Sequence, residues 1–140
     1  MLVAQRGFVL CDRKRGEAMQ INEILGECLF PVILGSNTEG HACVRRMGRE
    51  YGVPCTVLTG KRALTLRFLP DVKLVFAPAT LGDEVMLAVL GSLCDESGFR
   101  LPLLIECDGA YHGFVHRNRT LLEEKFILRE ASDILGGKRF

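Results

Sequence analysis

Four short and almost wholly apolar runs constrain the fold of this chain more than any other feature of its sequence. They are FPVIL (30–34), CTVL (55–58), LVFA (74–77) and LPLLIE (101–106). Continuous apolar runs of this length, without polar alternation, are typical of strands that are buried on both faces in parallel sheets. We therefore expect four strands, each covered by helices on both sides.

Two clear helical patterns separate these runs. After the turn GSNTEG, apolar residues recur at helical spacing as far as Tyr51, and Gly52 supplies the stop. The pattern also predicts a helix over residues 83–97, ended by Gly98. Gly91 lies inside that helix, where glycine is unfavourable, and this suggests close packing against a neighbour.

The rest of the chain gives weaker signals. Residues 61–72 are expected to form a loop, and short helices are expected over residues 111–116 and 120–125. Thr120 and Glu123 have the spacing of a capping box, which would open the second of these helices.

The alternation of strands and helices predicts an α/β fold: a Rossmann-like three-layer α/β/α domain with a mainly parallel sheet of about four strands. A chain of 140 residues suits one domain. We expect this domain to span residues 19–135, preceded by a disordered or non-native leader (1–18) and followed by a tail (136–140).

Ligands of such sheets bind beyond the carboxyl ends of the strands, where the strand order reverses. The first and fourth runs are expected to flank that point. Residues 35–37 and the pair Asp108-Gly109 should then face one crevice. Asn37 or Thr38 is expected to cap the first helix. For Asp108, contact with a ligand and capping of the next helix are equally favoured, and Tyr111 joins the site only if its helix faces the crevice.

The turn after the first strand resembles a phosphate-binding loop in its spacing alone. Gly35 and Gly40 are placed as in a P-loop, but His41 and Ala42 replace the lysine and the hydroxyl residue. Without these two groups, the sequence predicts only a strand-to-helix turn whose backbone amides can receive an anion or a polar ligand. No dinucleotide fingerprint is present, and for Lys61-Arg62 a solvated basic loop is favoured over a contact with a 2′-phosphate.

Several functional classes are disfavoured. The net charge is +1 with no basic block, which argues against nucleic-acid binding, and the apolar stretches are too short to span a membrane. Six cysteines are scattered singly without zinc-site spacing, which indicates free thiols and a cytoplasmic location. His112 and His116 are spaced as metal ligands but lack the glutamate of a zinc motif, so we expect solvent-facing or capping histidines. No catalytic residue and no metal ligand is predicted.

Two long segments together resemble a known family. INEILGECLFPVILGSNTEGHACVRRMGREYGVPCTVL and LPLLIECDGAYHGFVHRNRTLLEEKFIL, followed by ASDIL, are similar to the N-terminal, pre-ATP-grasp domain of ATP-grasp carboxylate–amine ligases. This group is related to D-aspartate ligase and, more distantly, to carbamoyl-phosphate synthase. The resemblance covers Met19 to Leu135.

The resemblance implies a Rossmann-like domain that forms one wall of a ligase active site. The family uses ATP and Mg²⁺ to activate a carboxylate as an acyl phosphate, which an amine then attacks. In the family, ATP and Mg²⁺ are bound by two further domains, so the 140 residues alone are expected to be inactive. Carried over by position, the substrate-binding residues are Gly35, Ser36, Asn37, Thr38, Glu39, Asp108, Gly109 and Tyr111. The family usually has another glycine or acid near Ser36.

Two alternatives remain open. The chain is either a free-standing module that binds a nucleotide or a small metabolite, or an interaction subunit that completes a partner chain carrying the ATP-grasp domains. A homodimer is compatible with each of these readings.

Overall fold

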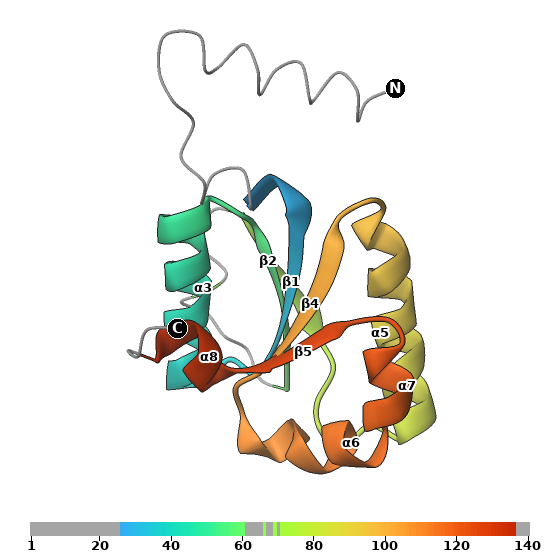
Figure 1. The fold of residues 1–140 in the computed structure, drawn as a ribbon. Helices are drawn as coiled ribbons and strands as arrows, with labels where there is room; N and C mark the ends of the chain where they lie inside the picture. Colours follow the sequence, from blue (N-terminus) through green and yellow to red (C-terminus); the bar gives the residue numbers. More distant parts are fainter. Residues whose placement is uncertain (1–25, 61–65, 67–68, 70, 137–140) are drawn as a thin grey trace, which may run out of the picture.

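A computed structural model describes residues 26–60, 66, 69 and 71–136 of the protein (Figure 1). The expected leader, the pair Lys61-Arg62 and nearly all of the expected tail lie outside these residues. No helix among the described residues has the length and apolar character needed to cross a membrane.

A five-stranded parallel sheet forms the centre of the domain. Its strand order is β3-β2-β1-β4-β5, and each neighbouring pair is parallel. The strands are β1 (Leu29–Leu34), β2 (Cys55–Thr59), β3 (Val72–Phe76), β4 (Leu101–Glu106) and β5 (Ile127–Glu130). The first four confirm the predicted strands to within two residues. The fifth, at the edge beside β4, was not predicted.

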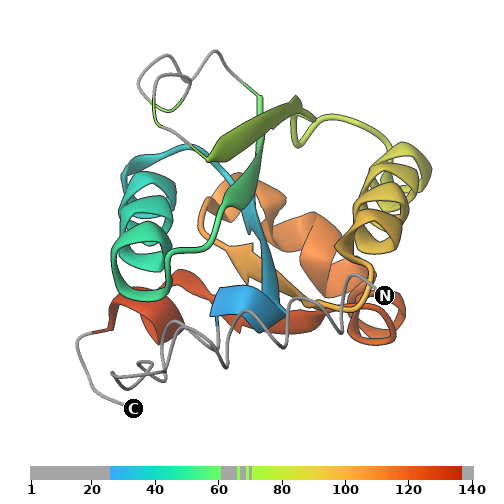
Figure 2. The same ribbon diagram turned by 90° about the horizontal axis from the view of Figure 1, so that it is seen from above.

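Helices cover both faces of this sheet, which confirms the predicted three-layer α/β/α fold. The helices are α3 (Thr38–Tyr51), α5 (Asp83–Ser97), the 3₁₀ turn η1 (Gly109–Tyr111), α6 (His112–Arg117), α7 (Arg119–Glu123) and α8 (Ala131–Leu135). Figures 1 and 2 show α3 and α8 on one face and α5, α6 and α7 on the other.

The sheet separates two apolar cores. On the side of α5, Leu34, Leu104 and Phe114 belong to one buried cluster. On the side of α3, Ile33, Met47 and Ile105 belong to the other. Successive residues of β1 and β4 thus alternate between the two cores, which is why these strands are apolar at almost every position.

The two long helices begin and end as the sequence predicts. The Asn37 side chain accepts a hydrogen bond from the Gly40 amide at 2.9 Å and caps α3. Gly52, in the left-handed region at φ 63°, ends it. In α5 the predicted bounds are confirmed and Gly98 is the stop.

Two local predictions were wrong. Helix α7 begins at Arg119, one residue before Thr120, and no side chain caps it. Asn118 instead donates to Asp83 and to the carbonyl of Phe114, and this fixes the junction between α6 and α7. A capping box does occur, at the start of α8. The second error concerns Gly91, because a Cβ atom there would meet no atom within 4 Å.

Candidate functional site at the carboxyl edge of the sheet

The strand order reverses between β1 and β4. From β1 the chain moves outward through β2 and β3, then crosses back to place β4 on the other side of β1, followed by β5. The connections that follow β1 and β4 therefore run to opposite faces of the sheet. Ligands of open α/β sheets usually bind at the carboxyl ends of the two strands where this happens. This is the location that the sequence predicted.

The turns after β1 and β4 are in direct contact. The Leu34 carbonyl accepts hydrogen bonds from the amides of Cys107 and Asp108, both at 3.1 Å. Asn37 closes the contact from the other side, because its Nδ2 donates to the Cys107 carbonyl at 3.2 Å. Since Oδ1 of the same side chain caps α3, Asn37 joins the helix start to the β4 turn.

Glycine is required where these turns meet. Gly35 has φ +116°, and a Cβ atom there would lie 2.4 Å from the Cβ of Asp108. A Cβ on Gly40 would lie 2.1 Å from the Gly35 carbonyl oxygen. The turn is thus folded tightly on itself, and the Gly40 amide is already bound by Asn37. This arrangement does not fit a phosphate cradle, which needs free amides around an open loop.

A closed series of hydrogen bonds links the carboxyl ends of four strands. Ser36 Oγ and Thr59 Oγ1 lie 2.7 Å apart, and the Ala77 amide donates to the Thr59 carbonyl at 2.9 Å. The Tyr111 hydroxyl donates to the Ala77 carbonyl at 2.7 Å, and the Tyr111 amide returns to the Asp108 carbonyl at 3.0 Å. With the Asn37 bond to Cys107, which adjoins Asp108, these contacts form what we call the rim ring.

Apart from Gly35, which is buried at the contact between the turns, the predicted site residues divide into two groups. Ser36, Asn37 and Tyr111 use their side chains within the rim ring. Tyr111 is 2% exposed, and burial, assisted by the nearby Asp108 carboxylate, raises its pKa to about 12. The Tyr111 hydroxyl therefore stays protonated at neutral pH and donates a hydrogen bond to the Ala77 carbonyl.

The second group is turned toward solvent. Thr38, Glu39 and Gly109 are exposed, and Asp108 is partly exposed. Asp108 Oδ1 accepts a hydrogen bond from the Ala110 amide at 2.9 Å, so the capping role of this residue is real. Its other carboxylate oxygen makes no hydrogen bond within the described part of the chain. The groups left for a ligand are this oxygen and the exposed first turn of α3.

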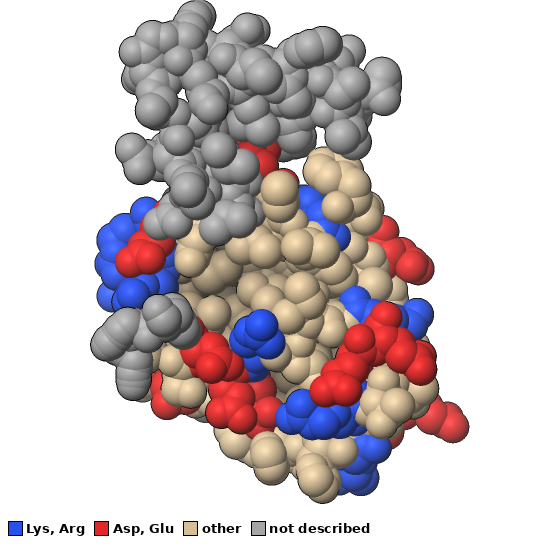
Figure 3. All heavy atoms as spheres, viewed as in Figure 1, with Lys and Arg blue, Asp and Glu red and all other residues tan. Residues whose placement is uncertain are grey.

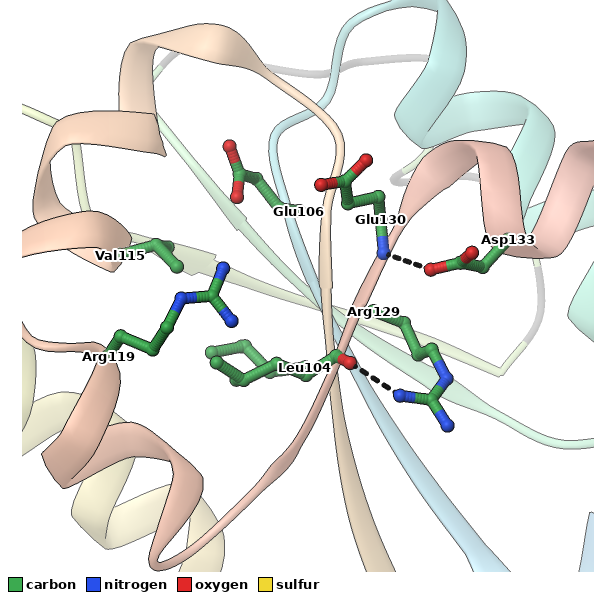
Figure 4. Close-up of a pocket in the computed structure, with 8 residues that line it drawn as sticks. Leu104, Glu106, Val115, Arg119, Arg129, Glu130 and Asp133 are labelled. Carbon is green, nitrogen blue, oxygen red and sulfur yellow. Dashed lines mark hydrogen bonds between the residues drawn. The ribbon is translucent and has the colours of Figure 1, made fainter.

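A cavity of about 280 Å³ opens beside this edge, between the ends of β4 and β5 and helices α6 and α7 (Figure 4). Its lining residues are Leu104, Glu106, Val115, Arg119, Leu128, Arg129, Glu130 and Asp133. None of them was among the predicted site residues. They were missed because the run FILRE, which contains β5, was not recognised as a strand.

Charges of both signs surround this cavity over an apolar floor. Glu106 and Glu130 are register partners at the ends of β4 and β5, and Glu106 also contacts His112 Nδ1 at 2.8 Å. Figure 4 shows the two carboxylates on the same side of the strands and the Arg119 guanidinium extending past Val115 into the space between Glu106 and Leu104. The Arg129 side chain turns away and donates to the Leu128 carbonyl at 2.8 Å.

The thiols near the edge are structural. Cys43 and Cys107 are buried with their sulfur atoms 3.6 Å apart, between α3 and β4. The hydrogen bond to Cys43, together with burial, raises the pKa of Cys107, and burial raises the pKa of Cys55 to about 12. The same hydrogen bond, which Cys107 donates, lowers the pKa of Cys43 against the effect of its burial. The raised pKa values of Cys107 and Cys55 keep these two buried thiols protonated at neutral pH, and protonated thiols are poor nucleophiles.

The two histidines of α6 are exposed, as expected. The rings of His112 and His116 are stacked with centroids 6.1 Å apart. Among the described residues no group of three His, Cys, Asp or Glu side chains is placed to hold a metal ion.

The distribution of charge over the surface agrees with the near-neutral composition. In Figure 3 acidic and basic side chains occur in small groups of both signs around an uncharged central area of the face that is shown.

Comparison of the chain with models of protein families, with curated proteins and with solved structures gave no significant match.

Proposed function

We propose that this chain is the substrate-side N-terminal domain of an ATP-dependent carboxylate–amine ligase. The observation that supports this proposal is the contact between the Gly35–Glu39 turn and the Asp108 turn at the reversal of strand order. In this proposal the carboxyl edge of the sheet forms one wall of the ligase cleft and holds a small polar substrate. The proposal also draws on the resemblance described above, which aligns the same two turns with that family.

The rim ring explains how such a wall would be kept rigid. Four strand ends are joined by hydrogen bonds, so the turns that carry Asp108, Thr38 and Glu39 are held in place, and the Asp108 carboxylate is also held by the Ala110 amide. A ligand that binds fixed groups loses less conformational entropy than one that must order them. This suits a domain whose task is to position a substrate for chemistry carried out by other groups.

ATP and Mg²⁺ do not fit the described residues of this edge. The turn at Gly35 is closed, the lysine of a phosphate-binding loop is missing, and no three-residue metal group occurs in the described ranges. When bound in a ligase, ATP supplies the phosphoryl group that activates the carboxylate. We assign its binding to further domains or to a partner chain, and assign this domain the tasks of binding and orienting the substrate.

A free-standing binding module is the second candidate. It is favoured by the 280 Å³ cavity, whose lining combines apolar and charged side chains. A small metabolite suits this cavity better than a nucleotide, because the neighbouring turn cannot cradle phosphates.

Two measurements test the ligase proposal. The first is the sequence of the natural gene on both sides of this domain. A continuation into, or a neighbouring gene for, a domain rich in lysine and acidic residues supports the ligase, whereas a natural protein made of this domain alone, without such a partner, contradicts it. The second is calorimetric titration of the chain with ATP-Mg²⁺ and NADP. We expect no binding, and micromolar binding of either nucleotide would contradict the ligase proposal.

A further inference from the structure

We propose that the cavity beside β4 and β5 binds a small aliphatic amino acid in its zwitterionic form. Its ammonium group lies between Glu106 and Glu130, and its carboxylate pairs with Arg119. This inference deepens the proposed function by giving the substrate class, and the ligand's role as a ligase substrate rests on that proposal. The binding site itself rests only on the described residues.

The paired carboxylates favour a cationic group. Glu106 and Glu130 are partners in the parallel register of β4 and β5, on strands about 4.8 Å apart. Their side chains lie on the same side of the sheet (Figure 4). Like charges directly opposite each other are destabilising, and an ammonium group between them would relieve this repulsion while donating up to three hydrogen bonds.

Both carboxylates are held in place by other parts of the fold. The Glu106 side chain is only 16% exposed, and its contact with His112 Nδ1 at 2.8 Å fixes its orientation. Glu130 is the first residue of the α8 capping box, in which its side chain accepts a hydrogen bond from the Asp133 amide. Glu130 is exposed, but this hydrogen bond restrains its carboxylate, so an ammonium ligand meets two acceptors that are each held by a contact within the fold.

Arg119 supplies the opposite charge across the cavity. Its Nη1 contacts Glu123 at 3.3 Å, in an ion pair whose two side chains are about half exposed. Within the described ranges, its Nε and Nη2 atoms make no hydrogen bond. A guanidinium with free donors matches the two oxygens of a carboxylate.

The apolar floor of the cavity favours a ligand with a small aliphatic side chain. Leu104 and Val115 are buried members of the apolar core, and Leu128 packs against them. The volume of about 280 Å³ lies just below the range of roughly 300–1,000 Å³ that is usual for ligand pockets. An apolar floor flanked by an acidic and a basic side is complementary to an amino acid. A simple anion would face the two glutamates, and a simple amine would leave Arg119 unused.

The test uses the full chain with labelled leucine and valine methyl groups and three probes of similar shape. Valine, as both enantiomers, carries both charges, isovalerate lacks the ammonium group, and isobutylamine lacks the carboxylate. In an NMR titration we expect valine to shift the methyl signals of Leu104, Val115 and Leu128, and to bind about tenfold or more tightly than either analogue. Equal binding of all three probes, or no shift at these methyls with millimolar valine, would overturn the proposal.

Two variants separate the charged contacts. E106Q should weaken valine about tenfold and leave isovalerate unchanged, because it alters only the ammonium side. R119Q should weaken both valine and isovalerate. R46Q is the matched control, since the Arg46–Glu50 pair is also an i,i+4 ion pair but lies in α3 on the other face of the sheet. It should leave valine binding unchanged, and an equal loss in R46Q would contradict the proposal.

The outcomes also distinguish the two proposals. If valine fails to bind while the natural gene encodes an adjoining ATP-binding domain, the ligase proposal stands and the amino-acid site is wrong. If valine binds as expected and the natural protein is a single domain without a partner, the site stands and the ligase proposal is wrong.

Discussion

Replacing Gly35 by alanine tests the contact between the two turns most directly. The new Cβ atom would lie 2.4 Å from the Asp108 Cβ and 3.1 Å from the Asp108 amide nitrogen. Asp108 cannot retreat freely, because its amide donates to Leu34 and its side chain caps η1. The substitution must therefore either separate the turns or distort one of them.

Three terms set the size of the effect. Alanine at φ +116° costs about 1–2 kcal/mol of backbone strain, and the overlap with Asp108 costs about 1–3 kcal/mol. Alanine also lowers the conformational entropy of the unfolded chain, which stabilises the folded protein by about 0.4–1 kcal/mol. The steric terms prevail, and we expect G35A to lower the free energy of unfolding by about 1–5 kcal/mol.

Urea denaturation followed by circular dichroism measures this loss. G91A is the matched control, because Gly91 lies inside α5 and a methyl group there would meet no atom within 4 Å, so alanine should stabilise the protein by about 0.5–1 kcal/mol. A G35A protein that is as stable as the wild type would refute the close approach of the two turns.

Three further outcomes are expected. Y111F should cost about 1–2 kcal/mol, because it leaves the buried Ala77 carbonyl without its donor. The folded pKa of Tyr111, about 12, exceeds the ordinary value of 10, so this advantage over Y111F in urea melts should be complete below pH 10 and vanish as the pH rises through 12. Arg117 lowers the pKa of Asp83 to about 2, so the stability that D83N lacks should be present above about pH 4 and disappear as the pH falls through 2, measured by acid titration of both proteins. Brief alkylation of the native protein, mapped by mass spectrometry, should label the exposed Cys28 and spare the three buried thiols until urea is added; early labelling of those thiols would contradict their burial.

The central strands of the sheet could be predicted from the sequence because they are buried on both faces. The runs that became β1, β2 and β4 are apolar at almost every position, and only a strand covered on two sides has that pattern. The reversal point between β1 and β4 followed from the order of elements. Residue type narrowed the cap of α3 to Asn37 or Thr38, and the structure assigns it to Asn37.

The edge was harder to predict. Strand β5 has only four residues, and its sequence ILRE shows no continuous apolar run, because an edge strand is half exposed and carries charges at its end. Without β5, nothing in the sequence placed Glu130 beside Glu106, and the cavity was missed. The contact of Tyr111 with Ala77 was also beyond sequence reasoning, since it joins elements 34 residues apart.

The rim ring has a consequence for protein engineering. Only four side chains, those of Ser36, Asn37, Thr59 and Tyr111, take part in it, and every other donor or acceptor is a main-chain atom. Together with the glycine beside Ser36, they make a small set that could be transplanted into another parallel sheet with the same strand order. The carboxyl edge of the recipient sheet would then be cross-linked by hydrogen bonds, while the helices and outer surface of the recipient would keep their own sequence.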